Sequence, residues 1–272
     1  MNPIFRWAGS KLQLVHEIEK LSPKSKKYFE PFLGGGSVFF HLQEKRDYKY
    51  IWLNDINDKL ITTYRIIQNR PQDLIDNCKK LKKNYDNKDY NIQKNFFLNK
   101  RTKFNKNLNT INSLETATNF LFLIQTCYDG IYRTNLTGEF NNSFSQKDIF
   151  YINEEQILNG SKALQKAKIN CGNYYECANF VDKNSFVFLD PPYYNREYDY
   201  FNKGIEEINL KKLFSFCCYL DDLGAKFILC NSKHKDVKNI FEKEFFIKEV
   251  ETTRIISQKK TVKEYMILNY NK

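Results

Sequence analysis

Asp190, Pro191, Pro192 and Tyr193 directly follow an apolar run at 185–189 and could form a site for an amine. The two prolines restrict the backbone, so the carbonyls of Asp190 and Pro191 can be held facing a substrate. The Asp190 carboxylate and one of these carbonyls are both acceptors, which suits a planar amine with two hydrogens. Accepting both hydrogens would favour the tetrahedral nitrogen that attack on a methyl group requires, and Tyr193 could stack on the base carrying the amine. The alternative is a strand-end turn with a capping Asp.

A second candidate site is the glycine-rich turn in E30-P-F-L-G-G-G-S37. A strand that leads into glycines and then a helix is typical of a nucleotide-type cofactor site, because glycines let the backbone approach the ligand. Phe32 could pack against the cofactor, and Asp55, at the end of the next strand, could accept hydrogen bonds from a ribose. NAD and S-adenosylmethionine sites share this pairing, and a tight turn is a third interpretation. The chain has no P-loop motif.

The elements that must position these residues alternate between strands and helices. Strands are predicted at 27–30, 50–55, 185–190, 225–231, 245–251 and 263–270. Helices are predicted at 12–21, 37–45, 57–69, 71–83, 90–103, 114–127, 153–166 and 207–223. This order predicts an α/β fold with a doubly wound, mostly parallel sheet, whose last two strands have the alternation of antiparallel strands.

The middle of the chain, roughly 70–165, lacks this alternation and is predicted to be an inserted, mostly helical lobe. Its stretch at 129–145 is rich in Gly and Asn and predicts a turn or hairpin. The net charge is +11, and the segment from Lys79 to Lys106 has ten Lys and Arg against two Asp. A polyanionic partner is a fair inference. The alternatives are codon bias in an AT-rich genome and a solvated helix face.

Cysteine and histidine usage bears on metals and on the cell compartment. The seven cysteines form no C-x-x-C pair, and only His16, His41 and His234 could help to bind a metal. We therefore expect reduced thiols and no metal site. No apolar run approaches the ~20 residues of a membrane span, and the first residues do not resemble a signal peptide. A cytoplasmic protein is expected.

Four motifs together carry a family resemblance: R6-W-A-G-S-K11, E30-P-F-L-G-G-G36, N54-D-I-N57 and D190-P-P-Y193. In this order they resemble the Dam-type (class alpha, D12 class) adenine-N6 DNA methyltransferases. The resemblance spans most of the chain and implies a class I, Rossmann-like methyltransferase that uses S-adenosylmethionine. It also implies a flipped adenine in double-stranded DNA as substrate. Residues 1–70 and 165–272 would then form the catalytic domain, and 71–164 the target-recognition insertion.

The resemblance also assigns contacts to the cofactor. Lys11 can pair with its carboxylate beside Trp7, and Asp55 matches the ribose-binding acid. The segment C171-G-N-Y-Y-E resembles the strand end at the cofactor adenine, although the family commonly has Asp where this chain has Asn173. The expected catalytic residues are Asp190, Pro191, Pro192 and Tyr193. The expected cofactor-binding residues are Trp7, Lys11, Glu30, Phe32, Gly34, Gly36, Asp55, Asn173, Tyr174 and Asp190.

Residues 129–141 resemble the family's target-recognition hairpin, in which Arg133 would recognise a guanine through O6 and N7, or else pair with phosphate. Asp129 replaces the family's usual Asn, and the ending F140-N-N-S-F-S145 lacks the usual Pro and Gly. A GATC or GAT-containing site is the expectation from the family, and these changes leave the target sequence open. R254-I-I-S-Q-K-K-T-V-K-E264 resembles the C-terminal basic loop and last strand. The expected DNA-binding residues are Asp129, Arg133, Asn135, Asn141, Arg254, Lys259 and Lys260.

Several rival functions remain open at this point. Cytosine-N4 methyltransferases usually carry Ser where this chain has Asp190, and enzymes that modify RNA or protein glutamine carry Asn. A non-catalytic DNA-binding protein on this scaffold is another rival, although both motifs are intact. A dehydrogenase would need a proton-transfer group, and no histidine is predicted at a strand end. We expect a monomer with no obligate protein partner.

Overall fold

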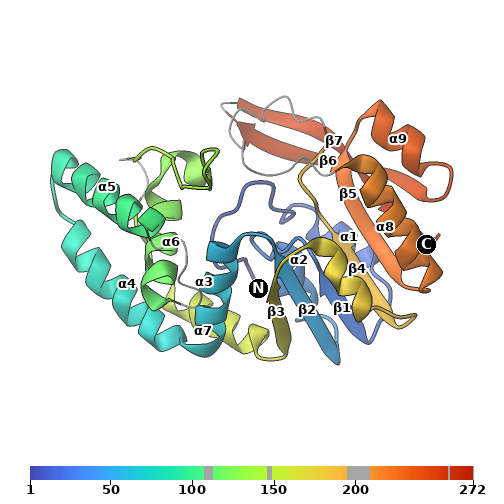
Figure 1. Ribbon diagram of the computed structural model, residues 1–272, viewed down its shortest axis with the longest axis horizontal. Coiled ribbons are helices and arrows are strands. Elements are labelled where there is room, and N and C mark those ends of the chain that lie inside the picture. Colours follow the sequence, from blue (N-terminus) through green and yellow to red (C-terminus); the bar gives the residue numbers. More distant parts are fainter. Residues whose placement is uncertain (107–112, 146–148, 195–208, 257, 272) are drawn as a thin grey trace.

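The molecule is built around one twisted sheet, here in a computed structural model that describes residues 1–106, 113–145, 149–194, 209–256 and 258–271. Within those ranges the sheet has seven strands in the order β3-β2-β1-β4-β5-β7-β6 (Figure 1). Strands β1 to β5 pair in parallel, whereas β7 is antiparallel to both β5 and β6. The strands are β1 Lys27–Glu30, β2 Tyr50–Asp55, β3 Ala167–Cys171, β4 Ser185–Leu189, β5 Lys226–Ser232, β6 Phe246–Ile256 and β7 Gln258–Leu268.

Both faces of the sheet are buried, because alternate residues of its strands enter two different hydrophobic clusters. In β4, Phe186 and Phe188 join one cluster, and Val187 and Leu189 join the other. An apolar strand of this kind needs helices on both sides. The helices are α1 Val15–Leu21, α2 Ser37–Leu42, α3 Asp58–Asn69, α4 Pro71–Tyr85, α5 Tyr90–Lys106, α6 Leu114–Thr126, α7 Glu154–Leu164, α8 Leu210–Asp222 and α9 Lys235–Phe241, with 3-10 turns η1 Tyr128–Gly130 and η2 Tyr174–Asn179.

The strand order reverses between β1 and β4, which are neighbours in the sheet. In open α/β sheets, ligands bind beyond the carboxyl ends of the strands at such a switch point. The glycine-rich turn follows β1, and Asp190 follows β4. The two motifs singled out for chemistry therefore meet at the one place in this topology that favours a ligand.

The helical lobe, residues 71–164, lies beside the sheet, beyond α3 (Figure 1). Helix α3 packs against both α6 and α7. Phe97, Phe120 and Phe140 of the lobe belong to the same hydrophobic cluster as Tyr28 of β1. The lobe thus continues the core of one sheet face. The division into domains at residues 70 and 165 stays a prediction.

The predicted α/β fold with a mostly parallel sheet is confirmed. The periodicity did not predict β3, whose end was expected only through the resemblance of C171-G-N-Y-Y-E to a strand end; α9 was not predicted, and β6 and β7 extend further than expected. His234 corrects a second expectation, because it lies two residues beyond β5 and its Nδ1 caps α9 by accepting from Asp236 N at 3.2 Å. Among the described helices, none is both long and apolar enough to cross a membrane.

Candidate active site

The glycine-rich turn has a backbone that only glycine adopts easily. Gly34 and Gly36 have φ angles of +47° and +67°. A Cβ on Gly34 would lie 2.8 Å from Cδ1 of Trp7, so this side chain fills the space that glycine leaves. The Asp55 carboxylate accepts from Gly34 N at 2.9 Å and from Asn57 N at 3.0 Å. Asp55 therefore fastens the turn to the end of β2, while burial raises its pKa.

The segment after β3, which is predicted to contact the adenine of the cofactor, contains a buried hydrogen-bond acceptor. Oδ1 of Asn173 is buried and makes no hydrogen bond of normal geometry among the described residues, although Asn173 and Glu176 are placed as a capping box at the start of η2. Burying a polar atom without a partner costs free energy, so such an atom indicates a missing ligand or water. Nearby, the rings of Phe32 and Tyr174 stack with centroids 5.1 Å apart. An acceptor beside aromatic rings fits an adenine with its exocyclic amine.

Lys11 connects the beginning of the chain to the end of β4. Its ammonium lies 2.8 Å from Oδ2 of Asp190 and donates to Gly9 O at 2.8 Å. The Lys11 side chain is only 5% exposed, and that of Asp190 is 19% exposed. Lys11 N also donates to Ser37 Oγ at 3.2 Å. Three predicted site segments are thus joined, although the pairing of Lys11 with Asp190 had not been predicted.

Tyr193 is anchored by Glu264, a residue for which the sequence predicted no role. Its hydroxyl donates to Oε2 of Glu264 at 2.5 Å, and both side chains are buried. The Lys11 ammonium lies 4.8 Å from the centroid of the Tyr193 ring. Because the ring is only 3% exposed, a base could stack on it only after the surrounding chain moves. The structure therefore does not present Tyr193 in the accessible position expected for stacking.

The polypeptide after Tyr193 is held by the end of β5. Tyr194 N donates to Oδ1 of Asn231 at 3.2 Å, and Ser232 Oγ donates to Tyr194 O at 2.8 Å. Asn231 is 1% exposed. The sequence signal for these contacts was a polar ending on the otherwise apolar run AKFILCN, which had been interpreted only as a buried strand.

Glu30 is a buried acid at the end of β1. Tyr28 donates its hydroxyl to Oε2 of Glu30 at 2.6 Å, and the side chain is 2% exposed. Burial raises the pKa of Glu30 to about 8, and the charges of Asp190 and Asp55 add to this effect. Glu30 is therefore mostly neutral at pH 7 in this structure, in contrast to an exposed glutamate.

The raised pKa of Glu30 predicts a specific pH dependence of stability. Folded protein keeps the proton up to about pH 8, whereas the unfolded chain releases it near 4.5. The stability from this group is present below pH 4.5 and is lost as pH rises through about 8. Between pH 5 and 8.5, we expect the Tm of Glu30→Gln to rise relative to wild type in thermal melts. Exposed Glu155→Gln is the control, and a constant Tm difference for Glu30→Gln would contradict the assignment.

Residues 133–141 form a small hairpin next to this site. Thr134 and Phe140 pair as an antiparallel bridge. Nε of Arg133 donates to Oδ1 of Asn141 at 2.8 Å, and Nη2 donates to Asn141 O at 3.0 Å. Asn135 shapes the tip through its side-chain amide, which donates to Glu139 Oε2 at 2.9 Å. Three residues predicted to bind DNA, Arg133, Asn135 and Asn141, therefore belong to one hydrogen-bonded unit.

The flanks of the hairpin explain how it holds its shape without the family's usual Pro and Gly. The buried side chain of Asn142 donates to Tyr128 O at 2.9 Å and to Ile131 O at 2.8 Å. Asp129 adopts a left-handed conformation with φ of 55°. Asn142 thus supplies hydrogen bonds across the strand ends, and Asp129 occupies a turn position.

Trp7 lies between the glycine-rich turn and the hairpin. Its ring stacks with Tyr132, with centroids 5.9 Å apart, and with Phe120 at 6.2 Å. It also lies against Gly34 and Gly35, and its ring meets that of Phe5 edge-on with centroids 6.3 Å apart. One side chain therefore touches both the glycine-rich turn and the hairpin, and the predicted place of Trp7 near the methionine end of the cofactor stays a prediction.

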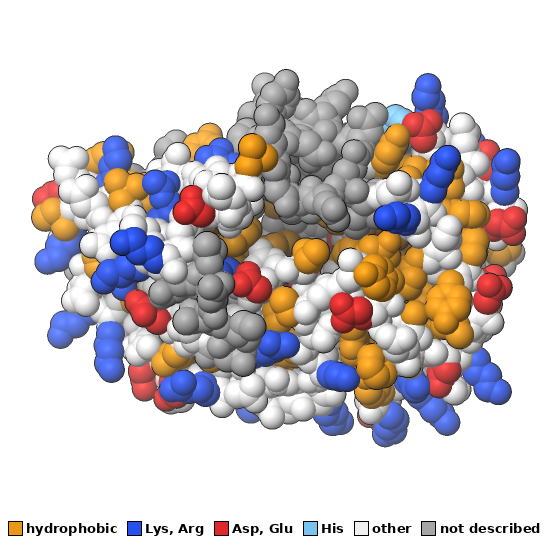
Figure 2. Space-filling view, viewed as in Figure 1, with side chains coloured by type: hydrophobic (Ala, Val, Ile, Leu, Met, Phe, Trp, Pro, Cys, Tyr) orange, Lys and Arg blue, Asp and Glu red, His pale blue; other side chains and the backbone are white. Residues whose placement is uncertain are grey.

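The other residues predicted to bind DNA lie on β6 and β7. The backbones of Arg254 and Ile255 pair with Lys260 and Lys259 in the β6–β7 hairpin. The side chains of Arg254, Lys259 and Lys260 lie outside the described part of the structure. On α4, Lys79 pairs with Glu154 in the lobe at 2.7 Å. Figure 2 shows Lys and Arg over the helical lobe with acidic side chains among them, so its basic charge is partly compensated.

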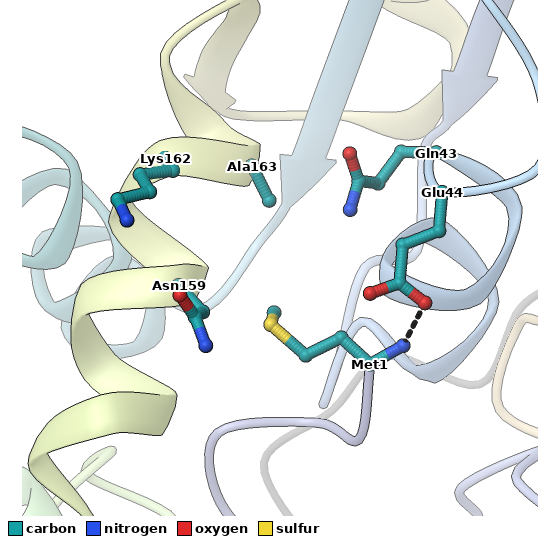
Figure 3. Close-up of a pocket in the computed structure, with 6 residues that line it drawn as sticks. All are labelled: Met1, Gln43, Glu44, Asn159, Lys162 and Ala163. Carbon is teal, nitrogen blue, oxygen red and sulfur yellow. Dashed lines mark hydrogen bonds and ion pairs between the residues drawn. The ribbon is translucent and has the colours of Figure 1, made fainter.

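A pocket of about 600 Å³ lies elsewhere, between α7 and the segment after α2 (Figure 3). The N-terminal ammonium of Met1 pairs with Glu44 at its rim. None of the predicted site residues lines it. Its lining residues are Met1, Gln43, Glu44, Asn159, Lys162 and Ala163.

Comparisons with known proteins agree with this geometry. A sequence model of the D12 class N6 adenine-specific DNA methyltransferase family matches residues 7–256. The chain is 35% identical to the Type II methyltransferase M.MjaIII of Methanocaldococcus jannaschii, over 99% of each protein. It is 27% identical to the Type II methyltransferase M1.LlaDCHI of Lactococcus lactis subsp. cremoris, over 99% of this chain and 96% of that protein. It is 33% identical to the DNA adenine methylase of Serratia marcescens, over 69% of this chain and 65% of that protein.

The family match decides among the rivals, because it favours adenine in DNA over cytosine, RNA and protein substrates and favours an enzyme over a non-catalytic binder. The order of the sheet and the site at its switch point agree with that match. The chain belongs to the D12 class of N6 adenine-specific DNA methyltransferases, which transfer a methyl group from S-adenosylmethionine to adenine in DNA.

Proposed function

We propose that this methyltransferase modifies an adenine flipped out of duplex DNA in a GATC or other GAT-containing site, with Asp190 as the residue that holds the reacting amine. The observation that supports the proposal most is the position of Asp190 at the carboxyl end of β4, beside the turn of β1 and 2.8 Å from the Lys11 ammonium. At this point a target amine and a cofactor bound at the turn can approach each other.

The cofactor site fits S-adenosylmethionine on two counts. Asn173 offers an unpaired buried acceptor for an adenine amine. Lys11 has three N–H donors, and its bonds to Gly9 and Asp190 use two of them, so one remains for the carboxylate of the cofactor. When bound, S-adenosylmethionine supplies a methyl group activated by its sulfonium.

The chain's own residues supply positioning. The Asp190 carboxylate and a backbone carbonyl of the Asp-Pro-Pro segment accept the two hydrogens of N6, which raises the electron density on that nitrogen. Lys11 fixes the orientation of the carboxylate through their ion pair. A base inside a duplex cannot reach Asp190, so flipping is required, at a cost of a few kcal/mol. Movement of the chain around Tyr193 then exposes its ring for stacking.

Target recognition is assigned to the hairpin and above all to Arg133. Asn141 holds the Nε and Nη2 side of the guanidinium, which limits the orientations available to it. We expect Arg133→Ala to reduce discrimination at one base pair by about 1–3 kcal/mol while cofactor affinity stays unchanged. Methylation rates on duplexes with single substitutions in the site test this. Arg70→Ala, at an exposed residue paired with Asp73, is the control. A uniform loss on all duplexes would instead assign Arg133 to phosphate.

The direct test of the target is expression in a host without DNA methylation, followed by mapping of modified bases by long-read sequencing. N6-methyladenine confined to GAT-containing sites supports the proposal, and modified cytosine or unrelated sites contradict it.

We also propose a cytoplasmic monomer that works without a protein partner. Light scattering of the purified protein checks that it is a monomer. The Type II names of two relatives support a place in restriction–modification.

A further inference from the structure

Two of the chain's three histidines meet a glutamate on the surface formed by α1 and α2. His16 and Glu19 lie one turn apart on α1, and His41 lies on α2, which packs against α1. One ligand atom from each residue lies within 4.8 Å of the other two. Nε2 of His41 is 2.6 Å from Oε2 of Glu19, and Nδ1 of His16 is 4.0 Å from the same oxygen.

The donor set is the kind that zinc accepts. Two imidazole nitrogens and one carboxylate oxygen form a common three-residue zinc site, in which each ligand atom lies about 2.0–2.2 Å from the metal. In such a site the ligand atoms lie farther apart than 2.6 Å and closer together than 4.8 Å. Small rotations of the three side chains would therefore bring their ligand atoms to zinc-binding positions. The His16 side chain is 80% exposed and has room to rotate, whereas that of His41 is 12% exposed.

We propose that His16, Glu19 and His41 bind one divalent transition-metal ion, with Zn²⁺ as the preferred ion. The site is separate from the methyl-transfer site and does not depend on the proposed target sequence. It departs from the expectation of no metal site, which rested on the absence of a spacing motif in the sequence. His16 and His41 belong to different helices, and only packing of α1 on α2 brings them together.

The surroundings set the strength of binding. His41 Nε2 and Glu19 Oε2 already lie 2.6 Å apart, so these two ligand atoms are close together before any ion binds. Lys45 and Arg46 also act on Glu19, and Arg46 donates to Glu19 O at 3.3 Å. These positive charges oppose a metal ion, so we expect a weaker site than a closed structural zinc site.

A metal ion at this position would hold α1 and α2 together, and these helices follow two segments of the predicted cofactor site. Helix α1 comes shortly after Lys11, and α2 begins at Ser37, directly after the glycine-rich turn. Lys11 N already donates to Ser37 Oγ, which joins the segment before α1 to the first residue of α2. Because the ion binds only the folded arrangement, it stabilises the protein by mass action.

The test uses chelator-treated full-length protein under reducing conditions, titrated with Zn²⁺ in competition with a chromophoric chelator. We expect one site in wild type, and a loss of affinity of at least about tenfold in both His16→Ala and His41→Ala. His234→Ala removes the third histidine and should bind as wild type does. Cys171→Ser, at an exposed cysteine, controls for binding by thiols.

Thermal melting gives a second readout that separates metal binding from packing. Zn²⁺ should raise the Tm of wild type and of His234→Ala but not that of His16→Ala. His16→Ala is the decisive variant because the exposed ring can be removed without opening the core. Equal zinc affinity in wild type and His16→Ala, or a loss of binding only in Cys171→Ser, would overturn the proposal.

Discussion

Replacing Asp190 with alanine is expected to reduce the rate of methyl transfer on the order of 1,000-fold at saturating DNA and cofactor. The expected loss is of the size seen when one preorganised polar group of an active site is removed. DNA affinity should stay within a few-fold, because the hairpin residues lie on other segments. Single-turnover methylation with a radiolabelled methyl donor, together with DNA binding by fluorescence anisotropy, measures both quantities.

The ion pair of Asp190 with Lys11 makes a folding control necessary. Lys11 is buried, and removing its partner leaves a buried charge, which can destabilise a protein by about 3–5 kcal/mol. Asp190→Asn keeps the shape and one acceptor oxygen, so it should melt closer to wild type while remaining strongly impaired in turnover. An Asp190→Ala protein that is folded and fully active would rule out the assigned role.

Substitution of Gly34 by alanine is expected to weaken S-adenosylmethionine binding by at least about tenfold. The left-handed conformation costs a residue with a Cβ roughly 1–2 kcal/mol. The new Cβ would also lie 2.8 Å from Cδ1 of Trp7, which is closer than two non-bonded carbon atoms can approach. Either the turn or Trp7 must move, and both border the predicted cofactor site. Isothermal titration calorimetry with the cofactor measures the effect.

Gly138 provides the matched control for this experiment. Its φ is +80°, so alanine there meets a similar backbone penalty, but nothing lies within 4 Å of the added Cβ. Gly138→Ala should therefore bind the cofactor as wild type does. If the two variants lose the same affinity, backbone strain and not displacement of Trp7 is responsible.

Local patterns in the sequence predicted every strand of the described sheet except β3, together with the two motifs at its edge. The apolar run before Asp190 indicated a central strand, and the glycines after Glu30 indicated a turn. Both belong to short contiguous segments whose chemistry is visible without a structure. The pattern did not predict β3, because only Ala167 of this strand is buried and its residues do not alternate between buried and exposed.

The contacts that join the motifs could not be predicted in the same way. Lys11 and Asp190, like Tyr193 and Glu264, are far apart in sequence, and no period or spacing links them. The same holds for His16 and His41, which packing brings together. The hairpin could be predicted only in part. Its glycines and asparagines predicted a turn, whereas the hydrogen bonds made by Asn142 depend on tertiary structure.

The position of β7 has a consequence for assembly of the enzyme. Although β7 follows β6 in the chain, it lies inside the sheet, between β5 and β6. In the described structure β6 pairs only with β7, so the two strands must join the sheet as one hairpin. That step delivers Glu264 to Tyr193. Contacts between distant segments form late, because closing a long loop costs entropy before the contact repays it. The Tyr193–Glu264 contact of the site therefore requires that the β6–β7 hairpin has joined the sheet.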